Sequence, residues 1–122
     1  MKHVLVVAGH STFREALSHL LVWDDFEESS QADSLEQGRR QLGILDDLID
    51  VAVVDLDLAD EGAIKLIGEM RGAEPDVPIL VLTTVSEIEL HDLLRRMGVQ
   101  EVLTKDTSAE QIVAAIRHLG ST

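Results

Sequence analysis

Apolar and polar residues alternate along the chain in blocks that predict five β-strands, each followed by a helix. Three of the predicted strands are almost continuous aliphatic runs: His3–Ala8, Val51–Asp55 and Pro78–Thr83. Strands that are apolar on both faces belong inside a parallel sheet covered by helices on both sides. Phe26–Ala32 is more polar and predicts an edge strand, and Val99–Leu103 predicts a short last strand.

The segments between the strands carry apolar residues at the spacing of one buried helix face. A second helix is expected from position 33 or 34 to about Leu45. Ser86, with Glu89 three residues later, has capping-box spacing, Ser108 is a candidate N-cap, and Gly98 suits the end of the fourth helix. The expected inward positions are Phe13, Ala16, Leu17, Leu20 and Leu21 in the first helix, Ala63, Ile64, Ile67 and Met70 in the third, Leu90, Leu93, Leu94 and Met97 in the fourth, and Ile112, Ala115, Ile116 and Leu119 in the last.

Five strand–helix units within 122 residues predict one α/β domain with a doubly wound parallel sheet. The flavodoxin-like (βα)5 arrangement with strand order 2-1-3-4-5 is the expected topology. In such sheets ligands bind beyond the carboxyl ends of the strands, where the strand order reverses. This rule predicts a site that contains Ala8, Gly9 and Asp55, with Thr83 and Lys105 on the neighbouring strands.

Composition narrows the classes of function. Ten basic and 23 acidic residues give a formal net charge of −13, and the chain has one Trp, two Phe and no Tyr. Direct binding of nucleic acid or of an anionic membrane is therefore not expected, because phosphate contacts need Lys and Arg and single strands need aromatic platforms. Absence of Cys fits a reducing compartment, and no apolar run approaches the length of a membrane span. We expect a cytoplasmic protein.

The chemistry of the predicted site rests on Asp55. It ends an apolar strand, so its carboxylate is partly desolvated and needs a cation or hydrogen bonds. Lys105 is the expected partner, and opposite charges about 4 Å apart attract by roughly 4 kcal/mol at an effective dielectric near 20, before desolvation is subtracted. Thr83 offers a hydroxyl between them. From these residues alone, a structural ion pair capped by a threonine is as good an interpretation as a functional site.

Over essentially its whole length the chain resembles the response-regulator receiver family. The resemblance rests on VAVVDLDL around Asp55, PILVLTT ending in Thr83 and Thr84, and EVLTKD with Lys105. The His10 segment, followed by REAL, is similar to receivers of two-component systems that are joined to a C-terminal helix-turn-helix DNA-binding domain. Residues 1–122 are therefore expected to form a single receiver-like domain, and a longer transcription regulator of which they are the N-terminal part stays open.

By this resemblance, Asp55 is the candidate phosphoacceptor, which takes a phosphoryl group from a histidine kinase. Thr83 would hydrogen-bond one phosphoryl oxygen and Lys105 would pair with another. Family members also hold Mg²⁺ with two acidic residues at the end of the first strand, together with the acceptor. Those two positions are Ala8 and Gly9 in this chain, so the acid pair is replaced.

The replaced acid pair separates the hypotheses on function. Mg²⁺ needs near-octahedral oxygen coordination, and only Asp55 and Asp57 would serve it if a weak site survived. We therefore expect no cofactor and an atypical receiver that acts by phosphorylation-independent protein–protein interaction, with at most self-directed phosphotransfer to Asp55 in place of enzyme activity. The alternative is a conventional receiver that uses Mg²⁺, with Asp57, Asp60 or Glu61 as replacement ligands. A remote alternative is a flavodoxin-like domain that binds a small molecule at Gly9.

Two further features bear on regulation and partners. Val102 stands where an aromatic rotamer switch is typical of the family, and the loop after Asp55 reads LDLADEG, one residue shorter than usual and without Met-Pro. A direct pair between Asp55 and Lys105 would hold one conformation permanently. The expected partners are proteins: an output domain, a histidine kinase, and a second copy bound through the region of the fourth and fifth helices, about Ser86–Leu119.

Overall fold

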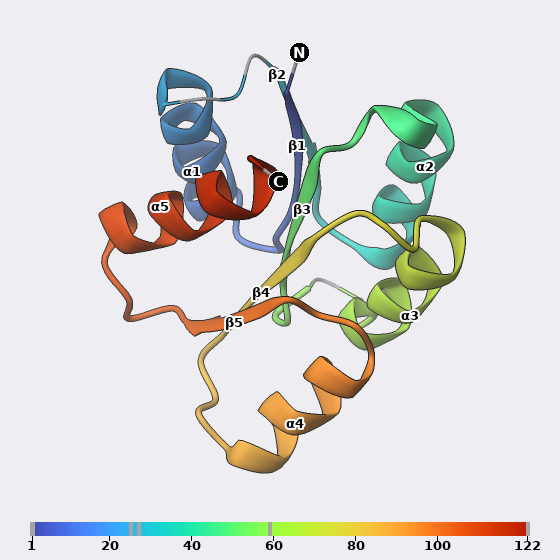
Figure 1. Cartoon of the computed structure of the whole chain (residues 1–122), viewed down its shortest axis with the longest axis vertical. Helices are drawn as coiled ribbons and strands as arrows, with labels where there is room; N and C mark the ends of the chain where they lie inside the picture. The colour runs from blue at the N-terminus through green and yellow to red at the C-terminus, as the bar shows by residue number, and fades with distance from the viewer. Residues whose placement is uncertain (1, 25, 27, 59, 122) are drawn as a thin grey trace.

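The strands form one parallel sheet in the order β2-β1-β3-β4-β5, with helices on both faces (Figure 1). The computed structural model describes residues 2–24, 26, 28–58 and 60–121. This topology confirms the predicted doubly wound sheet and its strand order. The strands are β1 (His3–Val7), β2 (Glu28–Ala32), β3 (Val51–Asp55), β4 (Ile79–Thr83) and β5 (Glu101–Thr104).

The helices cover the sheet in two groups. Side chains of α1 and α5 pack in one core cluster, and those of α2, α3 and α4 pack in the other, on the opposite face (Figure 1). A short 3₁₀ turn, η1 (Asp46–Leu48), joins α2 to β3. The α-helices are α1 (Ser11–Asp24), α2 (Leu35–Leu45), α3 (Ala63–Ala73), α4 (Ile88–Arg96) and α5 (Ala109–Gly120).

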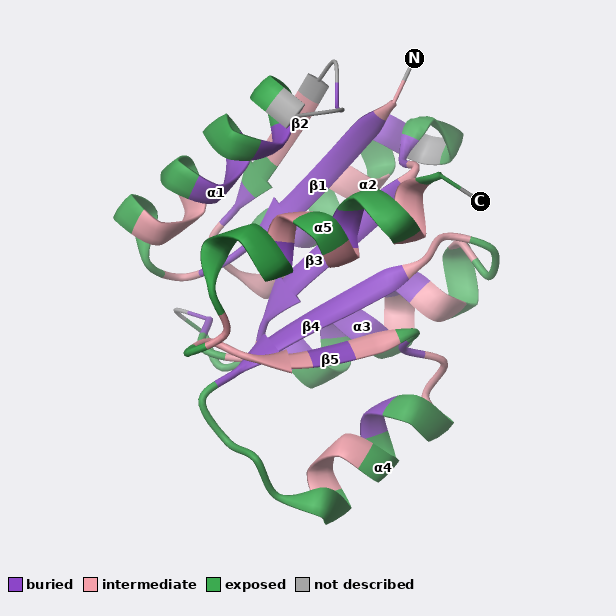
Figure 2. Ribbon diagram, turned by 60° about the vertical axis from the view of Figure 1, so that its left-hand side comes forward, coloured by how far each residue is buried: buried purple, intermediate pink, exposed green. Residues whose placement is uncertain are grey.

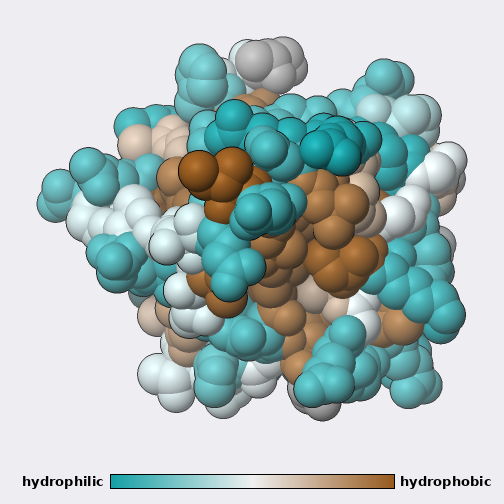
Figure 3. All heavy atoms as spheres, turned by 90° about the horizontal axis from the view of Figure 1, so that it is seen from below, coloured by the Kyte–Doolittle hydropathy of each residue, from teal (hydrophilic) through white to brown (hydrophobic). Residues whose placement is uncertain are grey.

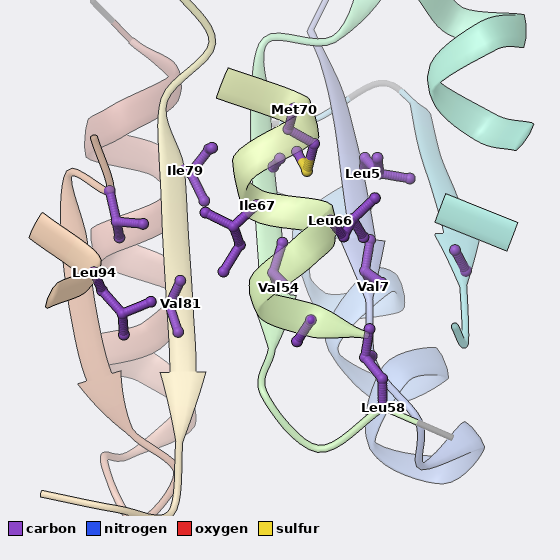
Figure 4. Close-up of a cluster of buried hydrophobic side chains, with 14 of the residues drawn as sticks. Leu5, Val7, Val54, Leu58, Leu66, Ile67, Met70, Ile79, Val81 and Leu94 are labelled. Carbon is purple, nitrogen blue, oxygen red and sulfur yellow. The ribbon is translucent and has the colours of Figure 1, made fainter. Parts of the chain in front are cut away.

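The three central strands β1, β3 and β4 are buried along their whole length, as the aliphatic runs predicted (Figure 2). Successive side chains of a strand point to opposite faces, so Leu5 and Val7 enter one cluster while Val4 and Val6 enter the other. Figure 4 shows the first cluster, in which α3 and α4 lay their buried leucine, isoleucine and methionine side chains on the sheet.

The parallel register brings the predicted site residues to one edge of the sheet. Val7 of β1 pairs with Val54 of β3. The residues that follow them, Ala8 and Asp55, therefore lie side by side at the sheet edge. Thr83 of β4 pairs with Thr104 of β5, directly before Lys105. The carboxyl ends of four strands therefore meet where the site was expected.

The helix stripes were predicted only in part. The predicted inward residues that are buried are Leu17, Leu21, Ala63, Ile67, Met70, Leu94, Ile112 and Ile116. Several predicted inward residues are wrong, because they lie at the margin of the stripe, where a helix that rests on a sheet turns toward solvent. The residues that are exposed against expectation are Ala16, Leu20, Ile64 and Leu93.

The predicted helix ends and strand bounds have mixed outcomes. Ser108 is the N-cap of α5, with its hydroxyl accepting the Gln111 N–H at 3.2 Å, and Gly98 ends α4 with a φ of 94°. The capping box at Ser86 is wrong, because Glu87 occupies the N-cap position of α4 and makes no side-chain cap bond. β2 begins later than predicted, at position 28; position 27 lies outside the described residues.

Candidate functional site

Asp55, the last residue of β3, has a fully buried side chain with two partners. Its Oδ2 atom lies 2.5 Å from the Nζ atom of Lys105, and its Oδ1 atom accepts the backbone N–H of Asp57 at 2.9 Å. The carboxylate therefore receives one charged and one neutral partner, as a buried carboxylate needs. The structure thus joins two of the residues that sequence reasoning placed in the site.

Lys105 is held at the sheet edge by its backbone as well as by its charge. Its N–H donates to the carbonyl of Thr83 at 2.9 Å, which continues the pairing of β4 with β5. The side chain is only 16% exposed. Besides Asp55, its ammonium lies 4.0 Å from Oδ2 of Asp57 and 4.9 Å from the centre of the Phe13 ring. Sequence reasoning placed Phe13 on the buried face of the first helix and missed this contact with the site.

Thr83 lies at the same edge, but its hydroxyl serves its own loop. The side chain is buried, and its Oγ1 atom accepts the N–H of Val85 at 3.0 Å. Thr84, the next residue, is exposed and borders a depression of about 190 Å³ that Lys105 also lines. A hydroxyl-lined space is therefore present next to the ammonium. A role for Thr83 toward a phosphoryl oxygen stays a prediction.

Arg14, on α1, contacts the end of β1, and sequence reasoning did not assign it to the site. The carbonyl of Ala8 accepts a hydrogen bond from Nη1 of Arg14 at 2.8 Å. The same guanidinium donates through Nε to the side chain of Gln31 on β2 at 3.0 Å. The signal that could have found it is the position of an arginine one turn into the helix that follows the strand. Ala8 has no side-chain oxygen, and its backbone oxygen is bound by Arg14.

The acidic residues of the loop after β3 have different surroundings. Both carboxylate oxygens of Asp60 accept the N–H of Leu35, at 3.1 and 3.0 Å, and Oδ1 also accepts the N–H of Gly62. These backbone donors, that of Leu35 foremost, hold the pKa of the Asp60 carboxyl below its usual value. Asp60 thus caps the start of α2. Glu61 lies with Asp57 on the rim of a depression of about 480 Å³.

These contacts decide how well the site fits Mg²⁺, which prefers several free carboxylate oxygens and keeps some of its waters. Ala8 and Gly9 supply no side-chain oxygen, both oxygens of Asp55 are engaged, and Asp60 is turned to α2. Among the residues that the structure describes, no three His, Asp or Glu side chains are grouped so that they could hold a metal ion. The donor set present does not fit a resident Mg²⁺.

Two apolar surfaces lie on the helices that flank the site. Trp23 is 77% exposed and borders a shallow groove of about 430 Å³ between α1 and α5. On the α4 side, Val85, Ile88 and Leu93 are exposed. Figure 3, which views the side of the molecule that carries α4, shows apolar side chains gathered within a border of polar ones. No helix in the part of the chain that the structure describes is long and apolar enough to cross a bilayer.

Most of the chain matches the profile of a known protein family. The profile described as "Response regulator receiver domain" matches residues 4–117. The virulence transcriptional regulatory protein PhoP of Salmonella typhimurium is 30% identical over 120 residues, which are 98% of this chain and 52% of that protein. The chain thus spans about half the length of the curated relatives that it matches.

Solved structures agree with this match. The non-phosphorylated HemR receiver domain of Leptospira biflexa superposes with a TM-score of 0.91 at 20% identity, over 100% of this chain and 96% of that one, and so supports the fold. A response regulator of Burkholderia pseudomallei superposes with a TM-score of 0.85 at 26% identity, over 99% of this chain and 69% of that one. That structure contains a phosphorylated aspartic acid, a calcium ion and citrate.

Proposed function

The chain belongs to the response regulator receiver domain family, and from this we propose that it acts in two-component signalling as an atypical receiver, through protein–protein contacts that do not require phosphorylation. The observation that carries the proposal is the closed site. Both oxygens of Asp55 are engaged, one by Lys105 and one by the backbone of Asp57. A nucleophile in this arrangement is not free, and Ala8 and Gly9 offer no side-chain oxygen to a divalent ion beside it.

Phosphoryl transfer to a carboxylate such as that of Asp55 has specific chemical requirements. Catalysis in this chemistry is mostly positioning and charge neutralisation, and metal ions supply much of the neutralisation. The end of β1 offers no carboxylate for such an ion, and the Ala8 carbonyl is bonded by Arg14. Lys105 instead neutralises Asp55 itself. The paired state is then the standing state of the domain, so its partners read a conformation that needs no phosphate.

A second candidate is the conventional receiver, in which Asp55 is phosphorylated by a histidine kinase with the help of Mg²⁺. The observation in its favour is that Asp55, Thr83 and Lys105 occupy the ends of neighbouring strands, in a fold shared with a regulator that contains a phosphorylated aspartic acid. Asp57 and Glu61 would then be the available ligands. In neither case do we propose an enzyme, beyond self-directed transfer to Asp55. Gly9 lines the depression of about 480 Å³ together with Asp57 and Glu61, but we do not propose a small-molecule-binding role there.

The partners that we propose are proteins. An output domain, or a histidine kinase, is supported by the relatives, which are about twice as long as this chain and are named transcriptional regulators. A homodimer through the region of the fourth and fifth helices is supported by the exposed Ile88 and Leu93 on α4. We propose no direct nucleic-acid contact by this domain, given its charge of −13. A cytoplasmic location is proposed from the transcriptional role that the relatives' names give those proteins.

The test is the intact mass of the chain after incubation with acetyl phosphate and Mg²⁺. We expect no phosphate adduct above the level of the Asp55→Asn variant, which serves as the matched control because it keeps the shape of the side chain. A stoichiometric adduct that Asp55→Asn abolishes would establish the conventional receiver and overturn the proposal.

A companion experiment restores the acid pair with Ala8→Asp and Gly9→Asp in one chain. We expect this variant to bind Mg²⁺, measured by calorimetry, and to take up phosphate from acetyl phosphate, because the ion again has carboxylate ligands. If the restored chain gains neither property, the replaced acids are not what prevents phosphorylation, and the argument from the ligand set is wrong.

A further inference from the structure

The side chain of Lys105 is only 16% exposed, and its ammonium lies over an aromatic ring. Its ammonium lies over the ring of Phe13, 4.9 Å from the ring centre, while Asp55 holds it at 2.5 Å from another side. A cation within about 6 Å of the face of a phenyl ring is attracted by the ring quadrupole. The lysine therefore has a carboxylate partner and an aromatic partner at once.

The ring and the ammonium are each held by parts of the fold that do not depend on the other. Phe13 lies in the first turn of α1 and packs against the core cluster between α1, α5 and the sheet. The backbone of Lys105 is fixed through its N–H, which donates to the Thr83 carbonyl at the end of β4, and its ammonium is held by Asp55. Because neither position is created by the contact, the contact is preorganised, and little entropy is lost when it forms.

We propose that Phe13 is the positioning residue that keeps Lys105 on Asp55, by attracting the ammonium and by excluding water from it. The inference rests on the proposed function and names how its closed state is maintained. Water that reached the ammonium would weaken the pair by screening it. Phe13 blocks that approach from the side of α1, next to the loop in which Ala8 and Gly9 provide no competing charge.

The aromatic side chain next to the site lies on α1 and not on β5. Val102 on β5, the position at which the family typically carries an aromatic switch, is a small buried side chain in the opposite core cluster. Phe13 lies in the cluster on the other face of the sheet. The aromatic contact of Lys105 is therefore made by α1.

The test uses the reactivity of the lysine side chains. The chain has three lysines, Lys2, Lys65 and Lys105, and the exposed Lys65 on α3 is the internal reference. The folded chain is treated briefly with acetic anhydride, and modification of each lysine is measured by peptide mass spectrometry. We expect Lys105 to react at least tenfold more slowly than Lys65. Phe13→Leu should raise the Lys105 rate about threefold to tenfold, which matches a cation–π contact of ordinary strength.

Matched variants separate this role from general packing. Phe13→Tyr keeps the ring and should keep Lys105 protected, whereas Phe13→Met fills the space without a ring and should behave as Phe13→Leu does. Val113→Ala removes a side chain that packs on the same core cluster from α5, and it should leave the Lys105 rate unchanged. Circular dichroism verifies that each variant is folded, and a resolved ammonium signal of Lys105 in the nitrogen-15 spectrum, absent in Phe13→Leu, gives a second readout.

The outcomes are distinct from those of the phosphorylation test. Equal Lys105 rates in the wild type and in folded Phe13→Leu and Phe13→Met would overturn the role of Phe13, whatever the phosphate adduct shows. An equal rise in Val113→Ala would overturn it too, because packing alone would then explain the protection. A phosphate adduct on Asp55 would overturn the proposed function, while the Lys105 rates, measured without phosphodonor, would still decide the role of Phe13.

Discussion

The ion pair between Asp55 and Lys105 makes a strong prediction about stability. At the observed 2.5 Å, two unit charges attract by about 7 kcal/mol at an effective dielectric of about 20, before the cost of desolvation. Removal of one member of a buried pair costs about 3–5 kcal/mol, because the other charge is left without compensation. We expect Lys105→Met to lose about 3 kcal/mol, the lower end of that range, since Asp55 keeps its bond from the Asp57 N–H.

A double-mutant cycle isolates the pair from other effects. Asp55→Asn keeps an acceptor for the Asp57 N–H and leaves a lysine that is 16% exposed, so it should cost only about 1 kcal/mol. The double variant, which has neither charge, should lose about 2 kcal/mol instead of the sum of about 4, a coupling of about 2 kcal/mol. Lys65→Met, on the exposed surface of α3, is the control and should stay within about 0.5 kcal/mol of the wild type.

The assay is equilibrium unfolding in urea at pH 7, with the free energy of unfolding taken from the linear dependence on denaturant. The m-value must stay constant across the four proteins of the cycle, because a changed m-value indicates a different unfolded state. A coupling below about 0.5 kcal/mol would refute the reasoning, since distant independent sites already show that much. Lys105 would then be a mobile side chain that visits Asp55, and the closed state would not be maintained by the pair.

Two other predictions concern the frame around the site. Asp60→Ala should lower the urea midpoint at pH 7, because it removes the cap of α2 at Leu35. The pKa of Asp60 is lowered on folding, so its contribution is present above the unfolded value of about 3.8 and is lost as the pH falls through the lower folded value. The urea midpoints of variant and wild type should therefore converge as the pH falls below the unfolded value. Gly38→Ala should lower the free energy of unfolding by about 1–3 kcal/mol despite better helix propensity, because the new Cβ would lie 2.6 Å from Cδ2 of the buried Leu66. Gly43→Ala, on the same helix, is the control: its Cβ would meet open space, and the variant should gain about 0.5–1 kcal/mol in the same urea assay.

The architecture was predictable because it depends on properties that act along a strand. Each aliphatic run is long enough to identify a strand that is buried on both faces, and a parallel sheet leaves no choice about which ends of those strands meet. Asp55, Thr83 and Lys105 were therefore placed at one edge before any contact was known. Leu20 and Leu93 were placed wrongly, because periodicity gives the direction of a stripe but not how much of its width the sheet covers.

The contacts that define the site's behaviour were not predictable, because each crosses between elements. Arg14 reaches back to the Ala8 carbonyl, Asp60 reaches across to the first turn of α2, and Phe13 covers an ammonium from the opposite end of the chain. Each depends on a side-chain direction and on a loop geometry that no spacing rule contains. The sequence shows that the acid pair is replaced, but it does not show these three contacts around the site.

The replaced acids and the closed pair are two sides of one electrostatic change. With carboxylates at positions 8 and 9, Asp55 would face like charges, and a divalent cation would be needed to offset them. With Ala8 and Gly9, no carboxylate faces Asp55 from the end of β1, and Asp55 pairs with Lys105. A domain with one standing state can be shifted only by something that binds another state more tightly. The surfaces on which such a partner can act include α1, which carries both Phe13 and the exposed Trp23, and α4, on which Ile88 and Leu93 are exposed.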